Sequence, residues 1–402
     1  MSITESGLMI MSNRHNPQDL AQMQSLPLEA KIMMTKQRIK AWYEAWHRFE
    51  IFDEETGKTR FVTYAVESPF DEPPMKATEW LVSDIPGWVY VSFSGGKDST
   101  VLKHIVDSMY GDVPSLFVNT GLEYPEIQKF VKEIKSGKYD CFNSDIEIVR
   151  PEMRFDEVLK KYGYPAISKD ISSCIYWGKR GSPTRLKRLN GELMLKNGNP
   201  SMFNCSKWKF MLDAPFEVSN ECCRIMKKNP SKKYEKNTMR KPILGLLAEE
   251  SIKRKSAWMK TGCNAFNIDR PQSQPMAFWT EQDILHYIKK YNVPYCPVYG
   301  DIVLEQPENA DKDQINIIDY LGCYEEEDTL TTTGCDRTGC IFCMFGCHLE
   351  KEPNRFQRLK ETHPRQYEYC INGGEMVDGK WQPNKEGLGL GKVLDFIGVQ
   401  YD

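Results

Sequence analysis

The sequence predicts an α/β fold, in which a parallel β-sheet carries helices on its faces. An apolar run over residues 89–93 leads through a polar turn with two glycines into a segment with apolar residues at helical spacing. A second apolar run at 115–121 is followed by a helical segment and then by a third run at 144–151. A strand and a helix are expected again over 241–258. Because strands that alternate with helices are typical of β-α-β units, these strands should share one parallel sheet.

Length, charge and hydropathy narrow the functional classes. The 402 residues are enough for two domains, or for one domain with large additions. The net charge of -3 predicts no general attraction to nucleic acid or to an anionic membrane. No apolar run is long enough to span a bilayer, and the first residues lack the pattern of a secretory signal. We therefore expect a cytoplasmic protein without membrane contact.

Two amphipathic helices are predicted outside the opening units. Residues 28–50 carry apolar side chains near helical spacing, and residues 61–68 could form a strand after them. Residues 279–295 have an apolar face, and the hydroxyl of Thr280 can cap their first turn.

The segment 178–191 is basic and contains glycine and proline, so we expect a mobile loop or an insertion. A charge run of this kind is usually a solvated surface, and the alternative is contact with a polynucleotide backbone. The basic residues are Lys179, Arg180, Arg185, Lys187 and Arg188.

Residues 94–99 form the polar turn between the first strand and its helix, and their composition suits anion binding. Glycine lets backbone N–H groups approach a phosphate closely. The helix N-terminus adds further N–H groups and a partial positive charge. Lys97 adds a full charge, and the hydroxyls of Ser94 and Ser99 can donate hydrogen bonds. The turn therefore predicts a site for a phosphate, diphosphate or sulfate group, and the alternative is that it only caps a helix.

The stretch SFSGGKDST, residues 92–100, resembles the pyrophosphatase (PP) loop of the adenine nucleotide α-hydrolase superfamily. The stretches FVNTGLEYPE (117–126), GLLAEESIKR (245–254) and PMAFWTEQDILHYIKKYNVPYCPVY (275–299) are similar to later motifs of its phosphoadenylyl-sulfate (PAPS) reductase branch, in the same order. The resemblance covers about residues 85–365. It implies a Rossmann-like sheet that binds ATP, adenylyl sulfate (APS) or PAPS.

Carried over by position, the resemblance implies a set of nucleotide contacts and two catalytic residues, Lys97 and Asp98. Asp98 could also help to hold Mg²⁺. One position departs from the pattern, because Leu247 stands where the third motif usually has arginine. That anion contact is then missing, or it is supplied by Lys253 or Arg254. The implied nucleotide contacts are Ser94, Gly95, Gly96, Lys97, Asp98, Ser99, Thr120, Gly121, Ser251 and Arg254.

Three segments follow from this assignment. We expect an N-terminal helical extension over residues 1–80, a PAPS-reductase-like nucleotide-binding domain over 81–310 and a cysteine-rich C-terminal region over 311–402. The extension matches no motif, and we expect it to contact a protein partner.

Thirteen cysteines are many for a cytosolic protein, where clustered thiols indicate metal ligands or catalytic groups. Cys222 and Cys223 are adjacent, and Cys340 and Cys343 form a C-x-x-C pair. The sequence resembles assimilatory APS reductases, which bind a four-iron, four-sulfur (4Fe–4S) cluster through a Cys-Cys pair and a later C-x-x-C. The resemblance therefore implies these four cysteines as cluster ligands.

The spacing leaves two alternatives open. In a rival ligand set, Cys335 and Cys347 replace Cys222 and Cys223 and hold either an iron–sulfur cluster or zinc. In the other alternative, the cysteines are small buried apolar residues.

Sulfonucleotide reductases resemble one another in a C-terminal Glu-Cys-Gly-(Ile/Leu)-His segment, whose cysteine attacks the sulfur. This chain ends without that segment, and its last cysteine is Cys370 in YEYCINGG. Either Cys370 is the nucleophile, or the protein is not a simple reductase. The alternative enzyme is an ATP-dependent adenylating sulfurtransferase that acts on nucleic acid, similar to phosphorothioation and tRNA thiolation enzymes. A second alternative is a non-catalytic nucleotide-binding regulatory subunit.

Overall fold

The computed structural model describes residues 15–46, 48–63, 81–83, 89–305, 325 and 328–402. The chain divides into two compact units. The first consists of Met1–Val118, Tyr124–Val149 and Ser231–Thr338, and the second of Asn119–Glu123, Arg150–Pro230 and Gly339–Asp402. The units interleave along the chain, and the three consecutive segments expected from the sequence stay a prediction. Among the helices of the described ranges, none combines the length and the apolar character needed to cross a bilayer.

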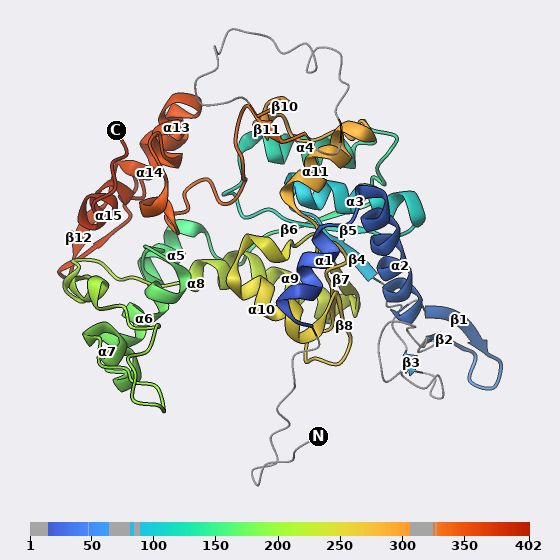
Figure 1. Ribbon diagram of the computed structural model, residues 1–402, viewed down its shortest axis with the longest axis horizontal. Coiled ribbons are helices and arrows are strands. Elements are labelled where there is room, and N and C mark those ends of the chain that lie inside the picture. The colour runs from blue at the N-terminus through green and yellow to red at the C-terminus, as the bar shows by residue number, and fades with distance from the viewer. Residues whose placement is uncertain (1–14, 47, 64–80, 84–88, 306–324, 326–327) are drawn as a thin grey trace. The chain divides into compact units, whose positions relative to one another are not determined.

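A six-stranded sheet forms the centre of the first unit, with the strand order β6-β5-β4-β7-β9-β8 (Figure 1). Neighbouring strands from β6 to β9 are parallel, whereas β8 runs antiparallel to β9. The predicted α/β fold with a parallel central sheet is therefore confirmed. The strands are β4 (Val89–Ser92), β5 (Ser115–Val118), β6 (Ile146–Val149), β7 (Lys241–Leu244), β8 (Asn264–Ala265) and β9 (Gln272–Ser273).

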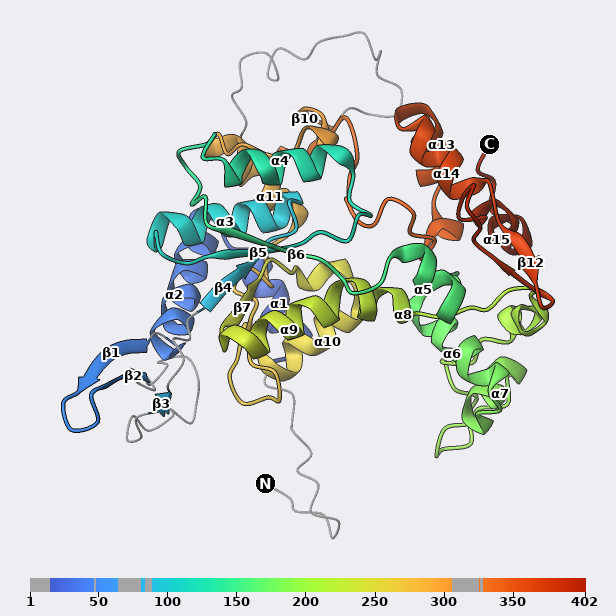
Figure 2. The ribbon, with the colours of Figure 1, turned by 180° about the vertical axis from the view of Figure 1, so that it is seen from behind.

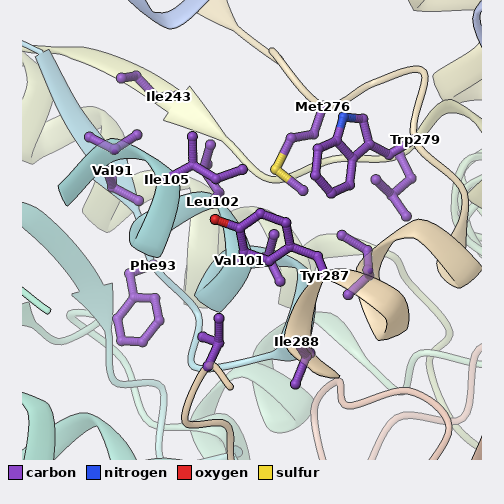
Figure 3. Packing of buried hydrophobic residues seen from close by; sticks show 14 of the residues in the cluster. Val91, Phe93, Val101, Leu102, Ile105, Ile243, Met276, Trp279, Tyr287 and Ile288 are labelled. Atoms are coloured by element: carbon purple, nitrogen blue, oxygen red, sulfur yellow. The ribbon is translucent and has the colours of Figure 1, made fainter. Parts of the chain in front are cut away.

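Successive side chains of β4 point to opposite faces of the sheet, and each face has its own core. Val91 and Phe93 belong to the larger core, where Figure 3 shows them near helix α3. Tyr90 lies on the other face with Leu116 and Tyr234. Helices α3, α4 and α11 lie on one side of the sheet and α10 on the other (Figures 1 and 2). The main helices are α1 (Pro17–Gln24), α2 (Leu28–Trp46), α3 (Lys97–Met109), α4 (Pro125–Lys135), α9 (Asn229–Thr238), α10 (Ile252–Thr261) and α11 (Glu281–Lys290).

The N-terminal helix α2 packs into the core of the first unit. Ile32, Ile39 and Trp42 are buried there. The ammonium group of Lys31 lies 2.8 Å from the carboxylate of Asp283 on α11, and both side chains are buried. The apolar face of α2 is therefore covered by its own chain. The rest of the predicted extension contains α1, β1 (Arg48–Asp53) and β2 (Lys58–Thr63), and β3 (Leu81–Ser83) follows just beyond it. Residues 1–14, 47 and 64–80 lie outside the described residues.

Lys31→Ala should destabilise the protein by about 3 kcal/mol, because it leaves the buried carboxylate of Asp283 without its cation. Urea unfolding followed by circular dichroism measures the change. Lys36→Ala is the control, since Lys36 is an exposed residue of the same helix, and its effect should stay within about 0.5 kcal/mol. Equal midpoints for the two variants would contradict the assigned role of the ion pair.

The second unit is mainly helical, and it brings residues 150–230 together with the C-terminal region. Tyr164 bridges to Val218, and its hydroxyl donates a hydrogen bond to the carbonyl of Leu388 at 2.8 Å. Phe216 bridges to Trp381. The principal elements are α5 (Phe155–Tyr162), α6 (Lys169–Lys179), α7 (Pro183–Asn190), α8 (Glu221–Cys223), η2 (Arg224–Lys228), α13 (Arg355–Thr362), α14 (Pro364–Ile371), β12 (Glu375–Val377), β13 (Lys380–Gln382) and α15 (Leu390–Ile397).

The expectation of a mobile loop over 178–191 is wrong, because most of this segment is helix α7. Proline at the first helical position favours the helix, and Gly191, with φ +79°, ends it in the left-handed conformation. Arg188 is buried, and it pairs with Asp170 at 2.5 Å. Lys179 donates to two backbone carbonyls, and Arg180 pairs with Glu217. Three of the five basic side chains therefore make contacts within the second unit.

Candidate functional site

The loop between β4 and α3 is held in shape by its own serines. The Ser94 amide donates to Ser99 Oγ at 3.2 Å, and Ser99 Oγ donates to the Gly96 carbonyl at 2.9 Å. Gly95 has φ +74°, and a Cβ there would lie 2.8 Å from a side-chain carbon of Ile127. Glycine is required at this position, since both the backbone conformation and the space exclude a side chain.

The loop borders a cavity of about 150 Å³ in the first unit. The cavity lies beyond the carboxyl ends of β4 and β7, which are neighbours in the sheet. In open α/β sheets, ligands bind at this end of the strands. Its lining residues are Ser94, Gly96, Lys97, Asp98, Ser99, Gly245, Leu246, Glu250, Arg254, Tyr299, Arg337 and Thr338.

Lys97 lines this cavity, and its side chain is held in place and only 5% exposed. Its ammonium group lies 2.8 Å from a Glu281 carboxylate oxygen and donates to the Asp336 carbonyl at 2.6 Å. The Lys97 amide donates to the Tyr299 hydroxyl at 3.0 Å, which in turn lies 2.6 Å from Thr338 Oγ1. The cation is therefore positioned before any ligand binds.

Asp98 has a buried carboxylate oxygen, Oδ1, with no hydrogen-bond partner. Burial raises the pKa of this carboxyl group, and the nearby cations of Lys97, Arg337 and Arg254 oppose that shift. An unpartnered buried oxygen beside the glycine loop suits a Mg²⁺ ion, which proteins often hold through one or two carboxylates and a substrate phosphate. The assignment of Mg²⁺ to Asp98 stays a proposal.

Two arginines reach the cavity, and both pair with one carboxylate. Glu250 forms ion pairs with Arg254 and with Arg337. Leu247 stands at the position of the motif arginine. It is 2% exposed and belongs to the apolar core, so it supplies no contact for an anion. Arg254 was expected as a substitute, whereas Arg337 was not, because it is far away in sequence and follows no nucleotide-binding motif. Lys253 is exposed and does not line the cavity.

Four of the expected nucleotide contacts do not line the cavity: Gly95 belongs to the loop itself, and the other three lie elsewhere. Ser251 is exposed, and its hydroxyl caps α10 by accepting a hydrogen bond from the Arg254 amide. Thr120 and Gly121 belong to the second unit, where the Thr120 hydroxyl donates to Glu123 at 2.6 Å. The assignment of these residues to a nucleotide stays a prediction, and none of the three lines the cavity.

Four thiols of the second unit lie within electrostatic reach of one another. Cys222 and Cys223 end α8, just before the π-helical turn η2. The pKa of Cys222 is raised by its hydrogen bond to Cys223, then by burial and by the charges of Cys343 and Cys340. The pKa of Cys223 is lowered to about 6 by its hydrogen bond to Cys222 and by nearby lysines. Burial raises the pKa of Cys340 to about 11.

Lysines lie beside this thiol cluster (Cys222, Cys223, Cys340 and Cys343), where their charges favour the thiolate form of Cys223. Lys169, Lys227 and Lys228 all lower the pKa of Cys223. Conversely, the pKa of Lys227 is raised, chiefly by Cys340. Thiolate ligands with neighbouring cations are the donor set that an iron–sulfur cluster requires. Within the described ranges, however, no group of three or more His, Cys, Asp or Glu side chains is arranged to hold a metal ion.

The rival cysteines have different surroundings. Cys347 is 1% exposed, and its thiol donates to the Met344 carbonyl at 3.0 Å. Cys335 belongs to the first unit, and its charge acts on Cys296. Cys370, the candidate nucleophile, is fully buried in α14, and burial raises its pKa. A nucleophilic thiol has to be ionised and accessible, and Cys370 has neither property in this structure.

Comparison with known proteins gives a family. The family model described as phosphoadenosine phosphosulfate reductase domain matches residues 88–196 and 197–344, which is more than half of the chain. An uncharacterized protein of Methanocaldococcus jannaschii is 24% identical over 284 residues, covering 71% of this chain and 47% of its own length. The chain thus spans about half the length of that relative.

Two other relatives carry functional names. Adenosine 5'-phosphosulfate reductase 2 of Bacillus subtilis is 23% identical over 220 residues, which cover 53% of this chain and 70% of that protein. Phosphoadenosine 5'-phosphosulfate reductase of Alteromonas mediterranea is 28% identical over 74 residues, covering 18% of this chain and 28% of that protein. The crystal structure of a PAPS reductase from Candida auris in a phosphate complex aligns with a TM-score of 0.29 and 14% identity, over 52% of this chain and 75% of that chain. A TM-score of this size carries no weight for the fold, which the parallel sheet itself establishes.

Proposed function

Because the chain belongs to the phosphoadenosine phosphosulfate reductase domain family, we propose that it is a cytoplasmic sulfonucleotide-reductase-like enzyme of sulfur metabolism. It binds the phosphate and sulfate groups of PAPS or APS, or the phosphates of ATP, in the cavity at residues 94–99. The main observation behind the proposal is that Lys97, held by its ion pair with Glu281, lines a cavity together with two arginines. Charge-assisted hydrogen bonds of this kind are the strong contacts in anion recognition.

Each part of the cavity has a separate task in this proposal. The N-terminus of α3 binds the oxyanion, since the amides of Ser94, Gly96 and Lys97 already donate to Ser99, Ser94 and Tyr299. Tyr299 fixes the loop by accepting from the Lys97 amide. Lys97 and the arginines neutralise the charge that builds up on the leaving group, which is the nucleotide phosphate when a thiol attacks the sulfur of APS or PAPS and diphosphate when ATP adenylates a substrate.

We propose that Cys222, Cys223, Cys340 and Cys343 hold a 4Fe–4S cluster. When bound, the cluster supplies a redox-active centre. The protein contributes two half-buried thiols from the C-x-x-C segment, the adjacent pair on α8 and the compensating lysines. The charges of Cys340 and Cys343 act on Cys222, and the charge of Cys223 acts on both of them, which supports this ligand set. Cys347 also interacts with Cys343, so the rival set has to be tested.

Cys340→Ser and Cys223→Ser should each lower the iron content of anaerobically purified protein to less than about one fifth of the wild-type value, because the loss of one thiolate opens the cluster to solvent. Cys335→Ser is the matched control, and it should keep its iron. The measurement is iron and sulfide per chain with the visible absorption spectrum. Iron loss in Cys335→Ser together with its retention in Cys223→Ser would instead establish the rival ligand set.

A second candidate function is ATP-dependent sulfur transfer to nucleic acid, and the burial of Cys370 favours it. Cys370, the expected nucleophile of a reductase, is inaccessible within α14. An enzyme that adenylates its substrate needs the loop but not this thiol. The partners of the two mechanisms differ, since only the second requires a polynucleotide.

The deciding experiment offers ATP, APS and PAPS side by side to the anaerobically purified protein, with a dithiol as reductant. Sulfite release from APS or PAPS supports the reductase. Pyrophosphate release from ATP without sulfite supports the sulfurtransferase. Binding of a nucleotide without turnover, even with a tRNA or DNA acceptor added, supports the regulatory alternative and contradicts the proposed enzyme.

A further inference from the structure

Cys174 and Cys205 form a pair of thiols in the second unit that lies outside the thiol cluster. Cys174 is on α6, and Cys205 immediately precedes the 3-10 helix η1 (Ser206–Asp213). Their sulfur atoms are 3.8 Å apart, and both cysteines are free. A disulfide bond is about 2.05 Å long, so the two sulfur atoms have to approach by less than about 2 Å to form one. Modest rotations of the two side chains cover that distance.

Helix α7 holds the backbone around the pair. The Cys205 thiol donates to Cys174 Sγ, and the Cys174 thiol donates to the Arg185 carbonyl at 3.6 Å. The Cys205 amide donates to the Arg188 carbonyl at 2.9 Å, and Arg188 Nε donates to the Phe203 carbonyl at 2.8 Å. Helices α6 and α7 lie side by side (Figures 1 and 2). Both cysteines are therefore bound to the same helix, which keeps their sulfur atoms in contact.

The pair has no part in the chemistry proposed above, since neither cysteine lines the cavity or belongs to the thiol cluster. Cys174 is 0% exposed and Cys205 7%, so solvent reaches the pair through Cys205. Burial and then the charge of Cys174 raise the pKa of Cys205 to about 12, and the charge of Arg188 opposes this shift. A buried thiol that is protonated at neutral pH reacts slowly. The pair therefore stays reduced in a reducing compartment and reacts with a small oxidant in excess.

We propose that Cys174 and Cys205 form an oxidation site, at which a peroxide converts the two thiols into a disulfide bond. The Cys205 thiolate attacks one oxygen of hydrogen peroxide, the O–O bond breaks, and the departing hydroxide takes up the thiol proton to give water. The Cys174 sulfur then attacks the resulting sulfenic acid, the S–O bond breaks, and a second water leaves. The peroxide gains the two electrons that the two sulfur atoms lose. The site is independent of the proposed function, because no nucleotide takes part.

The new bond fixes one segment of the second unit. It joins α6 to the start of η1 and encloses α7 together with residues 191–204. Closing a loop of about 30 residues restricts the unfolded chain, so the melting temperature should rise by about 5 °C. A dithiol reductant should reverse the change. Oxidation therefore acts as a reversible lock on this segment.

Peptide mapping tests the proposal on the full chain. Anaerobically purified protein is treated with hydrogen peroxide and a chelator for any released iron, and its remaining thiols are blocked with N-ethylmaleimide in denaturant. Trypsin, added without reductant, cleaves after lysine and places Cys174 in the peptide 170–179 and Cys205 in the peptide 197–207. The two peptides should be recovered chiefly as one linked species, which dithiothreitol separates. Calorimetry of samples taken before the blocking step measures the melting temperature.

Cys174→Ser should abolish both the linked species and the rise in melting temperature. Cys205→Ser is a second variant that removes the other sulfur, and it should give the same result. Cys141→Ser is the matched control, because Cys141 is an exposed cysteine of the first unit. This variant should keep the linked species and the rise.

Three results would overturn the proposal. The first is recovery of Cys205 as a sulfinic acid, or linked to a cysteine other than Cys174. The second is recovery of both thiols with N-ethylmaleimide attached, at a peroxide concentration that oxidises Cys141. The third is an equal rise in melting temperature in Cys174→Ser, because the stabilisation would then come from other cysteines.

Discussion

Gly95→Ala is expected to abolish anion binding at the loop and to cost about 2–6 kcal/mol of unfolding free energy. The alanine would have to adopt φ +74°, and its Cβ would lie 2.8 Å from Ile127. The strain of a left-handed conformation and the overpacking each contribute about 1–3 kcal/mol. Relief of the contact would shift the loop and misdirect its N–H groups. Urea unfolding and pyrophosphate titration measure the two effects.

Gly137→Ala is a matched control for this substitution. Gly137 has φ +76°, and a Cβ there meets no atom within 4 Å. It should therefore pay only the backbone strain, about 1 kcal/mol, and should leave pyrophosphate binding intact. If Gly95→Ala binds pyrophosphate as well as Gly137→Ala does, the loop is not the anion site.

Lys97→Ala is expected to weaken binding of pyrophosphate and nucleotides by about 100-fold and to reduce turnover at least as much. The substitution removes the cation nearest the loop and leaves the Glu281 carboxylate in its place, which repels an anion. Glu281→Gln should act in the opposite direction, because it removes the internal competitor for Lys97. Isothermal titration at two salt concentrations measures both variants.

Lys129→Ala controls for the loss of one positive charge, since Lys129 is exposed on α4 and lies outside the cavity lining. Its affinity for pyrophosphate should equal that of the wild type. Weaker binding in Glu281→Gln than in the wild type would show that Glu281 positions Lys97 rather than competing for it.

Local patterns were enough to predict the central architecture. The alternation of apolar runs with helical segments predicted the parallel sheet, and Thr280 does cap α11 by accepting from the Asp283 amide. The loop at residues 94–99 was also predictable, because its glycines, serines and lysine are consecutive. Such features depend on residues a few positions apart, so their physical causes are present in the linear sequence.

The basic segment shows where local reasoning failed. Glycine, proline and a charge run were interpreted as a mobile loop, yet they mark the two ends of α7. The helix is stabilised by partners elsewhere in the second unit, such as Asp170 for Arg188. Tertiary contacts overrode a weak local preference here, as they often do for short helices.

The sequence by itself determined the sheet, the glycine loop at residues 94–99 and the candidate cysteines, since each strand, the loop and each cysteine pair is encoded within one short stretch. Only the tertiary structure decided that Arg337 lines the cavity beside Arg254, that Cys370 is buried and that the thiols on α8 interact electrostatically with the C-x-x-C pair. The physical reason is the range of the interactions. Charge pairing and burial depend on distance in space. Folding brings together residues that are far apart in the sequence, and nothing in the local sequence around either residue indicates that they will meet.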